Sequence, residues 1–189
     1  MASDADRRLY WGAGVTVLVL DLITKFLAEQ HLLRSSGREV LGEWFQLRLV
    51  YNPGAAFGLD LGPYSRWIFM VVALVALVAL FRMALDAEPG DWFRQLALGL
   101  VSGGALGNLV DRIRSSQGVV DFLDVGVGQW RWPTFNVADM AVSCGAVALA
   151  ISLWREDARR EERGGVTSGR PMPPESTTPT DPMTARTEE

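Results

Sequence analysis

Residues 64–85 read YSRWIFMVVALVALVALFRMAL, and no charged residue lies between Arg66 and Arg82. Pro63 precedes this stretch, and proline suits the first turn of a helix. Each such stretch is close to the roughly 20 residues that a helix needs to cross a bilayer. The 189-residue chain contains four such apolar stretches, and too few polar residues remain to cover four apolar helices in a soluble protein. The sequence therefore predicts a mainly α-helical membrane protein with four transmembrane helices, the other three stretches being 9–33, 92–110 and 135–154.

Arginines around these stretches predict the orientation of the chain. Arg7 and Arg8 precede the first stretch, and Arg82 and Arg94 flank the connection between the second and third. Positive charge near membrane segments favours the cytoplasmic side. We therefore expect both termini in the cytoplasm and the loops 34–63 and 111–134 outside, although these outer loops also carry arginines. The fourth stretch is followed by Arg155, Arg159, Arg160 and Arg163.

The remaining segments divide into an ordered outer loop and a polar tail. Residues 43–51 are rich in aromatic and branched side chains and partly alternate, which predicts one or two short strands. A turn follows at 52–54, and the small apolar segment 55–59 is expected to lie on the membrane surface. Residues 1–163 are predicted to form the four-span domain. Residues 164–189, rich in Pro, Ser, Thr and Glu, are predicted to be a disordered cytoplasmic tail.

Three aspartates are placed at the outer face by this topology. Asp111 directly follows the third stretch, Asp121 lies in the loop before the fourth stretch, and Asp139 opens the fourth stretch. A carboxylate this close to a bilayer is costly and is a candidate for function. Two carboxylates brought together share one proton, so the ionised one can activate water while the protonated one polarises a carbonyl group. Spacing alone leaves open which two of the three form such a pair.

Several of these polar residues also have a purely structural interpretation. Asn136 and Asp139 are three apart at a helix start, as in a capping box. Asp21 and Lys25 are four apart and share a helix face, so they either neutralise each other, with Lys25 reaching outward, or brace an outer polar site. Asp111 next to Arg112 is compatible with a simple ion pair at the membrane interface, or with an Arg112 that binds lipid phosphate.

The glycine, cysteine and histidine residues indicate how the third helix packs and which metal or catalytic sites are excluded. Gly99, Gly103 and Gly107 recur at four-residue spacing, which predicts close packing of the third helix against its neighbours. Cys144 and His31 are the only residues of their types. An intrachain disulfide and a Cys-rich metal site are therefore excluded, and one histidine remains for any Ser-His-Asp triad. We expect Cys144 to be a small packing residue and His31 to lie at the membrane interface.

Five sequence motifs, taken together, resemble those of one protein family. Their order and spacing resemble those of the lipoprotein signal peptidases (type II signal peptidases), from the first span to the end of the fourth. The motifs are Asp21-Leu-Ile-Thr-Lys25, Asn52-Pro-Gly-Ala-Ala-Phe-Gly58, Gly103-Gly-Ala-Leu-Gly-Asn-Leu-Val-Asp-Arg112, Val119-Val-Asp-Phe122 and Phe135-Asn-Val-Ala-Asp139.

The resemblance implies a membrane aspartyl endopeptidase of the bacterial inner membrane with its active site at the extracytoplasmic face. Its substrates would be prolipoproteins carrying diacylglycerol, cut just before the lipidated cysteine. The implied catalytic pair is Asp121 and Asp139, which decides against Asp111. The implied fold adds a small extracytoplasmic β-cradle and a short surface helix to the four spans. Supporting or substrate-binding roles are implied for Asp21, Lys25, Asn52, Gly54, Gly104, Asn108, Arg112 and Asn136.

The resemblance also implies contact with membrane phospholipid, and no metal, cofactor or nucleic acid; the oligomeric state stays open. Two other classes of protein are compatible with parts of the sequence. A small transporter or proton-relay protein would explain Asp21 and Lys25 inside a span. A non-enzymatic scaffold would explain Asp139 as a helix cap. A relay, however, needs ionisable groups at mid-depth in several spans, and the second and fourth stretches have none there.

Overall fold

Four long helices and a small antiparallel sheet make up the fold in a computed structural model, which describes residues 3–34, 36–54 and 61–168. All four helices are long and apolar enough to cross a membrane, which confirms the four predicted spans. The helices are α1 (Asp4–His31), α2 (Ser65–Asp86, preceded by the short 3-10 helix η2, Gly62–Tyr64), α3 (Trp92–Arg114) and α4 (Val137–Ser168). The strands are β1 (Arg38–Leu41), β2 (Phe45–Asn52), β3 (Val119–Val127) and β4 (Trp130–Arg131).

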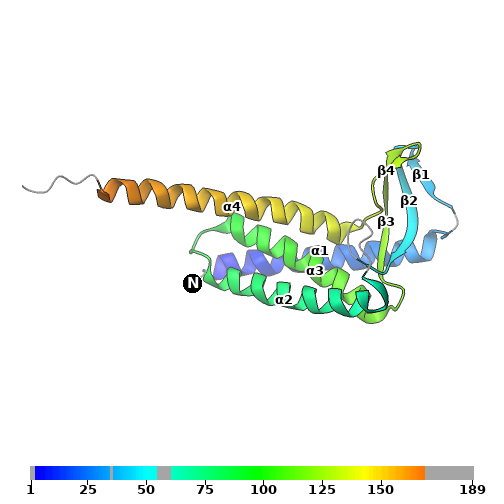
Figure 1. The fold of residues 1–189 in the computed structure, drawn as a ribbon, viewed down its shortest axis with the longest axis horizontal. Helices are drawn as coiled ribbons and strands as arrows, with labels where there is room; N and C mark the ends of the chain where they lie inside the picture. The colour runs from blue at the N-terminus through cyan, green and yellow to red at the C-terminus, as the bar shows by residue number, and fades with distance from the viewer. Residues whose placement is uncertain (1–2, 35, 55–60, 169–189) are drawn as a thin grey trace, which may run out of the picture. The chain divides into compact units, whose positions relative to one another are not determined.

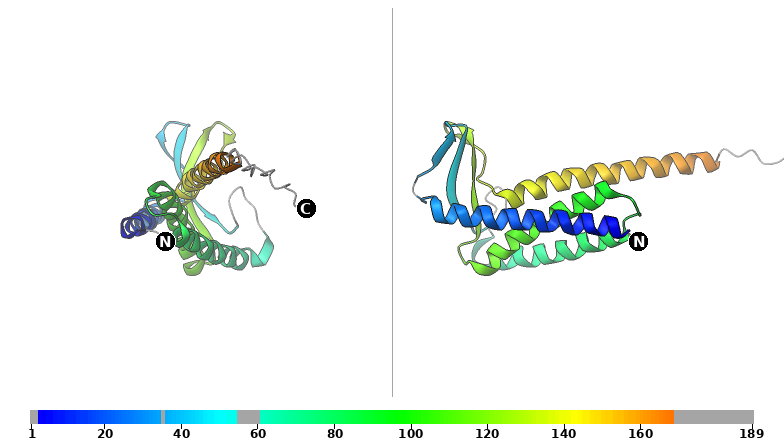
Figure 2. Two further views of the ribbon diagram at one scale, coloured as in Figure 1. Left: turned by 90° about the vertical axis from the view of Figure 1, so that its left-hand side faces the viewer. Right: turned by 180° about the vertical axis from the view of Figure 1, so that it is seen from behind.

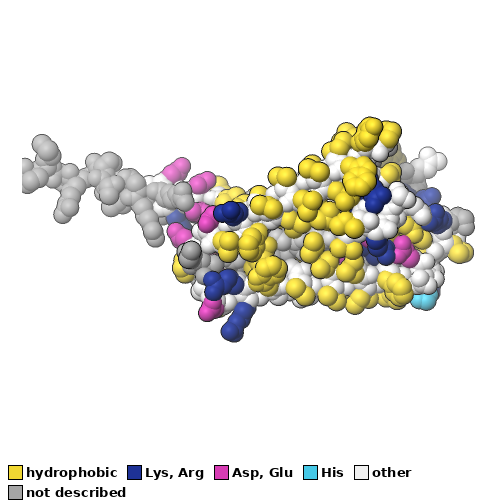
Figure 3. Space-filling view, turned by 90° about the horizontal axis from the view of Figure 1, so that it is seen from below, with side chains coloured by type: hydrophobic (Ala, Val, Ile, Leu, Met, Phe, Trp, Pro, Cys, Tyr) yellow, Lys and Arg dark blue, Asp and Glu magenta, His cyan; other side chains and the backbone are white. Residues whose placement is uncertain are grey.

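The outer surface of the helices suits lipid rather than water. On the face drawn in Figure 3, hydrophobic side chains cover the middle of the helices, and charged side chains gather near the ends. Helix α2 exposes Val71, Val75 and Val78, each by 59% or more. A continuous exposed apolar surface of this kind is unfavourable in water and favourable in a bilayer.

Glycines on α3 bring three helices into close contact. A Cβ atom on Gly99 would lie 2.6 Å from the backbone oxygen of Tyr10, and one on Gly103 would lie 2.5 Å from that of Gly14, so both face α1. A Cβ on Gly104 would collide with the backbone oxygen of Ala138 on α4. The predicted packing role of the small residues on α3 is therefore confirmed, and α3 is the element against which α1 and α4 are placed.

The sheet has the order β1-β2-β3-β4, and its strands lie across one end of the helices (Figure 1, Figure 2). The predicted strand at 43–51 is confirmed as β2. The prediction of a loop around Asp121 is wrong, because Asp121 lies in β3 and pairs with Val50. Branched and aromatic residues beside Asp121 favour the extended conformation, which the loop prediction overlooked.

The element boundaries differ modestly from the predicted ones. Helix α1 begins at Asp4, where Ser3 and Asp6 form a capping box. Helix α4 continues to Ser168, past the predicted end of the membrane domain at 163. The predicted surface segment 55–59 and the tail from 169 onward lie outside the described residues. The chain divides into two compact units between residues 153 and 154, and the site described below lies in the first unit.

Candidate active site

Asp121 is held by two asparagine side chains on the buried part of the sheet. Asp121 is 2% exposed. Oδ1 accepts a hydrogen bond from Asn136 Nδ2 at 2.7 Å, and Oδ2 accepts one from Asn52 Nδ2 at 3.2 Å. Asn52 is itself fixed at the end of β2, because its Oδ1 accepts a bond from the Gly54 backbone N–H at 3.0 Å. The predicted residues Asn52 and Asn136 therefore hold the orientation of the Asp121 carboxyl group.

Asp139 combines a capping role with a second contact. Its Oδ2 accepts from the Asn136 backbone N–H at 3.1 Å, and Asn136 Oδ1 accepts from the Asp139 backbone N–H at 2.9 Å. This is the capping box that the sequence indicated at the start of α4. The other carboxylate oxygen of Asp139 accepts a bond from Asn108 Nδ2 on α3 at 2.8 Å. Capping alone therefore does not account for the environment of Asp139.

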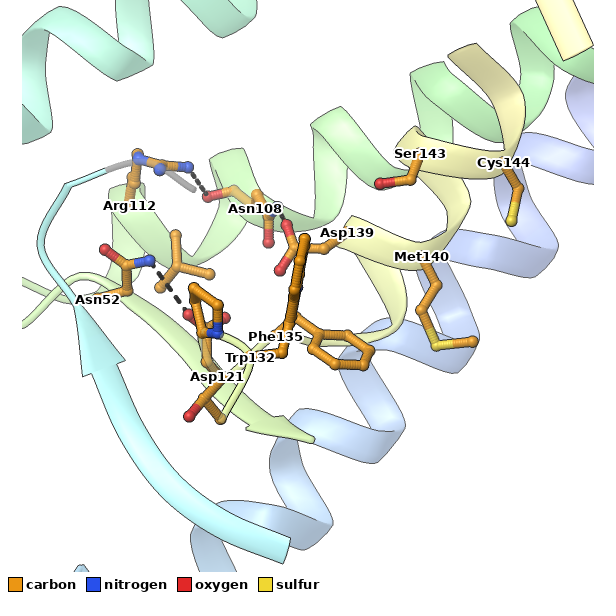
Figure 4. A pocket seen from close by; sticks show the side chains of 13 residues that line it. Asn52, Asn108, Arg112, Asp121, Trp132, Phe135, Asp139, Met140, Ser143 and Cys144 are labelled. Carbon is orange, nitrogen blue, oxygen red and sulfur yellow. Dashed lines mark hydrogen bonds between the residues drawn. The ribbon is translucent and has the colours of Figure 1, made fainter. Parts of the chain in front are cut away.

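Asp121 and Asp139 line one cavity of about 490 Å³, and Figure 4 shows both side chains there. Two amides link them, since Asn136 Nδ2 is also 3.1 Å from Asn108 Oδ1. Burial raises the pKa of Asp121 to about 7, and the negative charge of Asp139 adds to the increase. The hydrogen bonds from Asn52 and Asn136 act in the opposite direction. Near neutral pH, the cavity thus contains a carboxyl group that readily keeps a proton beside a second carboxyl group.

The third candidate, Asp111, does not line this cavity. It is fully buried, and its carboxylate accepts bonds from Lys25 Nζ at 2.9 Å, Arg114 Nε at 3.1 Å and the Val120 backbone N–H at 3.2 Å. The prediction that Asp111 pairs with Arg112 is wrong, because Asp111 pairs with Lys25 and Arg114 instead. Adjacent residues on a helix point in different directions, which explains the difference.

Asp21 and Lys25 form a buried brace beneath the site. Lys25 Nζ lies 2.7 Å from Asp21 Oδ2 and donates to Asn108 Oδ1 at 2.9 Å. Asp21 Oδ1 accepts a bond from the Ala138 backbone N–H at 2.9 Å, immediately before Asp139. Lys25 is 1% exposed, so the expectation that it extends outward is wrong. Both interpretations hold in combination: the two charges neutralise each other, and they also contact Asn108 and the start of α4 beside the cavity.

The other predicted residues lie around the cavity in different ways. Arg112 lines it, and its guanidinium group donates to the Gly54 backbone oxygen at 2.7 Å and to the Asn108 backbone oxygen at 3.2 Å. Gly104 does not line it; the missing side chain of Gly104 lets the first turn of α4 approach α3. Arg112 therefore joins the end of β2 to α3, whereas Gly104 affects the site through helix packing.

Sequence reasoning missed the apolar part of the cavity. Trp132, Phe135, Met140, Ser143 and Cys144 line it. Cys144 is exposed, so the expectation that it is a packing residue is wrong. Helical spacing could have found Ser143, because it is four positions from Asp139 and residues three and four positions apart share a helix face. His31 is exposed at the end of α1, where it was expected.

Comparisons with known proteins agree on one kind of protein. A family model described as "Signal peptidase (SPase) II" matches residues 14–155. The lipoprotein signal peptidase of Maridesulfovibrio salexigens is 41% identical over 145 residues, which is 75% of this chain and 92% of that protein. The corresponding protein of Rhodococcus jostii is 44% identical over 146 residues, covering 74% and 68% of the two chains.

A solved structure gives the same result for the fold. A bacterial membrane enzyme determined by the in meso method at 2.3 Å resolution superposes with a TM-score of 0.70 and 28% sequence identity. The match covers 78% of this chain and 88% of that one. A second structure of this kind, at 1.9 Å resolution, has a TM-score of 0.66 and 29% identity, covering 75% and 89%.

Proposed function

This chain belongs to the signal peptidase (SPase) II family and is a multi-pass membrane protease, and we propose that it is an aspartyl endopeptidase acting on diacylglyceryl-modified prolipoproteins. It removes the signal peptide by cleavage just before the lipidated cysteine. The observation that carries the proposal is the Asp121 and Asp139 pair, linked through two asparagine amides at one cavity. Paired carboxyl groups with one shared proton supply both the acid and the base for peptide hydrolysis.

In the proposed reaction, Asp121 holds the proton at rest and Asp139 is ionised. The raised pKa of Asp121 supports this assignment. Asp139 removes a proton from water as the water oxygen attacks the scissile carbonyl carbon, while the Asp121 hydroxyl donates a hydrogen bond to the carbonyl oxygen. The tetrahedral intermediate collapses as the carbon–nitrogen bond breaks, and the leaving amine takes the proton gained by Asp139. The pair then returns to its starting state, and no step uses a metal or cofactor.

The surrounding residues orient the pair. Asn52, Asn108 and Asn136 donate to its carboxylates and so fix their positions. Lys25 fixes the amide of Asn108 by donating to its oxygen, which leaves the amide nitrogen to face Asp139. We assign positioning roles to all four residues, and to Asp21 through its bond to the first turn of α4.

The position of the pair supports a membrane-confined, lipid-modified substrate. Asp139 begins α4, and β3 lies across the same end of the helices (Figure 1). A diacylated peptide has its cleavage site near the headgroups, so this depth suits it. We propose that this end faces the extracytoplasmic side of a bacterial inner membrane, with both termini in the cytoplasm, as the arginine distribution predicts. Prolipoproteins and membrane phospholipid are then the partners of the site.

A proton-relay or transport function has less support. Among the described residues, the buried acidic and basic side chains on the spans are Asp6 near one end and, toward the other, Asp21, Lys25, Asp111 and Arg112. Helix α2 contributes none to this set. A relay requires charged groups along the whole path, whereas here they collect around the cavity end.

Cleavage of a lipidated prolipoprotein by the purified protein in detergent tests the proposal. Asp121→Asn and Asp139→Asn should each abolish cleavage while thermal unfolding shows a folded protein. Asp124→Asn is the matched control, because Asp124 is also a buried aspartate of β3 but is paired with Arg131 at 2.7 Å. Near-normal cleavage by either of the first two variants would show that the proposed catalytic pair is wrong.

A further inference from the structure

A second cavity lies between α1 and α2 and is separate from the candidate active site. Its volume is about 230 Å³, and the described residues that line it do not line the cavity of the two aspartates. Trp11, Val15 and Leu18 of α1 and Leu77 and Phe81 of α2 form its walls. We call this cavity the α1–α2 groove.

The groove lies toward the end of the helices that is away from the active site. Trp11 is ten positions before Asp21, and Asp21 is the residue that binds the first turn of α4. Phe81 is near the end of α2, whereas Arg66 at the start of α2 binds the last turn of α3. Both walls therefore run from mid-membrane toward the start of α1 and the end of α2.

The interior of the groove is apolar, and one side is open. Ser102 and Gly103 of α3 also line it, and both are buried. The Tyr10 hydroxyl donates to Ser102 Oγ at 3.0 Å, so the two hydroxyl groups of the groove bond to each other. Trp11 and Val15 are each more than half exposed. An apolar hollow that opens on the side of membrane-spanning helices meets lipid rather than water.

The length of the groove matches one leaflet of a bilayer. Leu18 is eight positions after Tyr10, which is about 12 Å along α1. One leaflet contributes about half of the roughly 30 Å hydrocarbon core. The rings of Tyr10, Trp11 and Phe81 cluster at one end, with centroids 5.3–6.4 Å apart. Tyrosine and tryptophan prefer the membrane interface, so the groove runs from the interface through most of the acyl layer.

The volume of the groove decides what kind of molecule fits. A helix about 10 Å wide would occupy roughly 900 Å³ over a length of 12 Å. The groove holds about 230 Å³, which is too small for a helix of a substrate or of a second copy. A single hydrocarbon chain is thin enough to enter. The groove therefore suits one acyl chain of a lipid in the adjacent leaflet.

A cation lies where the headgroup of such a lipid would be. Arg8, Trp11 and Val15 are three and four positions apart, so Arg8 continues the groove side of α1 by one turn. Arg8 is exposed and, within the described part of the chain, makes no ion pair, whereas Arg7 pairs with Asp4. Anionic headgroups attract arginine at the membrane surface, so the charge of Arg8 complements a lipid phosphate.

We propose that the α1–α2 groove binds one acyl chain of an anionic phospholipid and that Arg8 binds the phosphate of this lipid. The bound chain extends the contact between α1 and α2 beyond their aromatic cluster. This lipid is distinct from any lipid attached to a substrate, because the groove shares no described lining residue with the active-site cavity. The inference rests on the membrane-spanning assignment and goes beyond the proposed peptidase reaction.

Photochemical cross-linking in vesicles tests the proposal. The full chain is reconstituted in phosphatidylcholine with increasing mole fractions of a phosphatidylglycerol that carries a diazirine in its acyl chain, and mass spectrometry locates the cross-links. Cross-links at Val15 and Leu18 should saturate at a low mole fraction. Those at Val71 and Val75, which are exposed on α2 and do not line the groove, should rise in proportion to the probe.

Matched variants separate the groove from the lipid around it. Leu77→Trp fills the groove and should abolish the saturable labelling, whereas Val78→Trp, at the next and exposed position, should preserve it. Arg8→Gln should raise the half-saturating mole fraction about fivefold, the factor that corresponds to about 1 kcal/mol for one arginine at an anionic surface. Arg7→Gln removes the same charge from an arginine already paired with Asp4 and should have little effect.

Three results would overturn the proposal. Labelling at Val15 and Leu18 that rises in proportion to the probe would show only bulk lipid. Absence of labelling there, with normal labelling at Val71, would show that protein covers the groove. Equal effects of Arg7→Gln and Arg8→Gln would remove the headgroup contact. No measurement here involves cleavage, so failure of this proposal and failure of the proposed peptidase activity are distinguishable.

Discussion

Replacing Asn52 by alanine should move the alkaline limb of the pH–activity profile to higher pH. The Asn52 amide donates to Asp121 Oδ2 at 3.2 Å and favours the ionised carboxylate, which lowers the pKa of Asp121. Burial and the charge of Asp139 outweigh this effect and raise that pKa to about 7. Removing the donor takes away one of the factors that favour the ionised form, so the pKa of Asp121 rises further.

The size of the shift follows from the hydrogen bond that is lost. A bond to a charged group contributes about 1.5–3 kcal/mol, and one pKa unit corresponds to about 1.4 kcal/mol. Because 3.2 Å is a long bond, we take the lower end, which is about one unit. The limb should therefore move from about pH 7 to about pH 8. Activity below the limb should persist, since the protonated form of Asp121 does not depend on this donor.

The assay is kcat/KM for a lipidated prolipoprotein, measured across the pH range in detergent. Thr134→Ala is the control, because Thr134 lines the same cavity and its removal enlarges the cavity without taking a donor from Asp121. The control should leave the limb in place. A limb that stays in place or moves to lower pH in Asn52→Ala would refute the assignment of Asp121 as the proton-holding member of the pair.

Three further changes probe the scaffold of the site. Gly104→Ala should lower stability by about 1–3 kcal/mol, because its Cβ meets the backbone of α4, whereas Gly12→Ala has open space; thermal unfolding compares the two. Lys25→Met should cost about 3–5 kcal/mol by removing the cation that contacts the buried carboxylates of Asp21 and Asp111, which chemical denaturation measures; an unchanged midpoint would contradict the brace. Asp111→Asn should reduce cleavage less than substitution of either proposed catalytic aspartate, and equal loss in a folded protein would reopen the choice of pair.

The spans were predictable because their information is local. A run such as 67–81 is apolar at every position, and length decides whether it crosses a bilayer. The glycine spacing on α3 also predicted close packing, but not which neighbour each glycine faces. Gly103 faces α1 and Gly104 faces α4, since successive helical residues point in different directions. Sequence spacing specifies a stripe on a helix, and the partner depends on tertiary packing.

The candidate site was harder to predict, because its contacts join residues far apart in the chain. The bond between Lys25 and Asn108 spans 83 positions, and that between Asp21 and Ala138 spans 117. Single-sequence patterns contain no information about such pairs. The motifs identified the polar residues, and the resemblance proposed their roles. Only the folded chain shows that the two asparagine amides connect Asp121 to Asp139.

Strand β3 explains why Asp111 and Asp121 have different environments although ten positions separate them. Asp111 accepts the backbone N–H of Val120, so it holds the start of the strand against α3. The side chain of the next residue, Asp121, points to the face of the sheet opposite the Val120 side chain, and it lines the cavity. The strand whose backbone binds one carboxylate therefore presents the other to the cavity. An alternation of one residue along β3 is sufficient to separate the two roles.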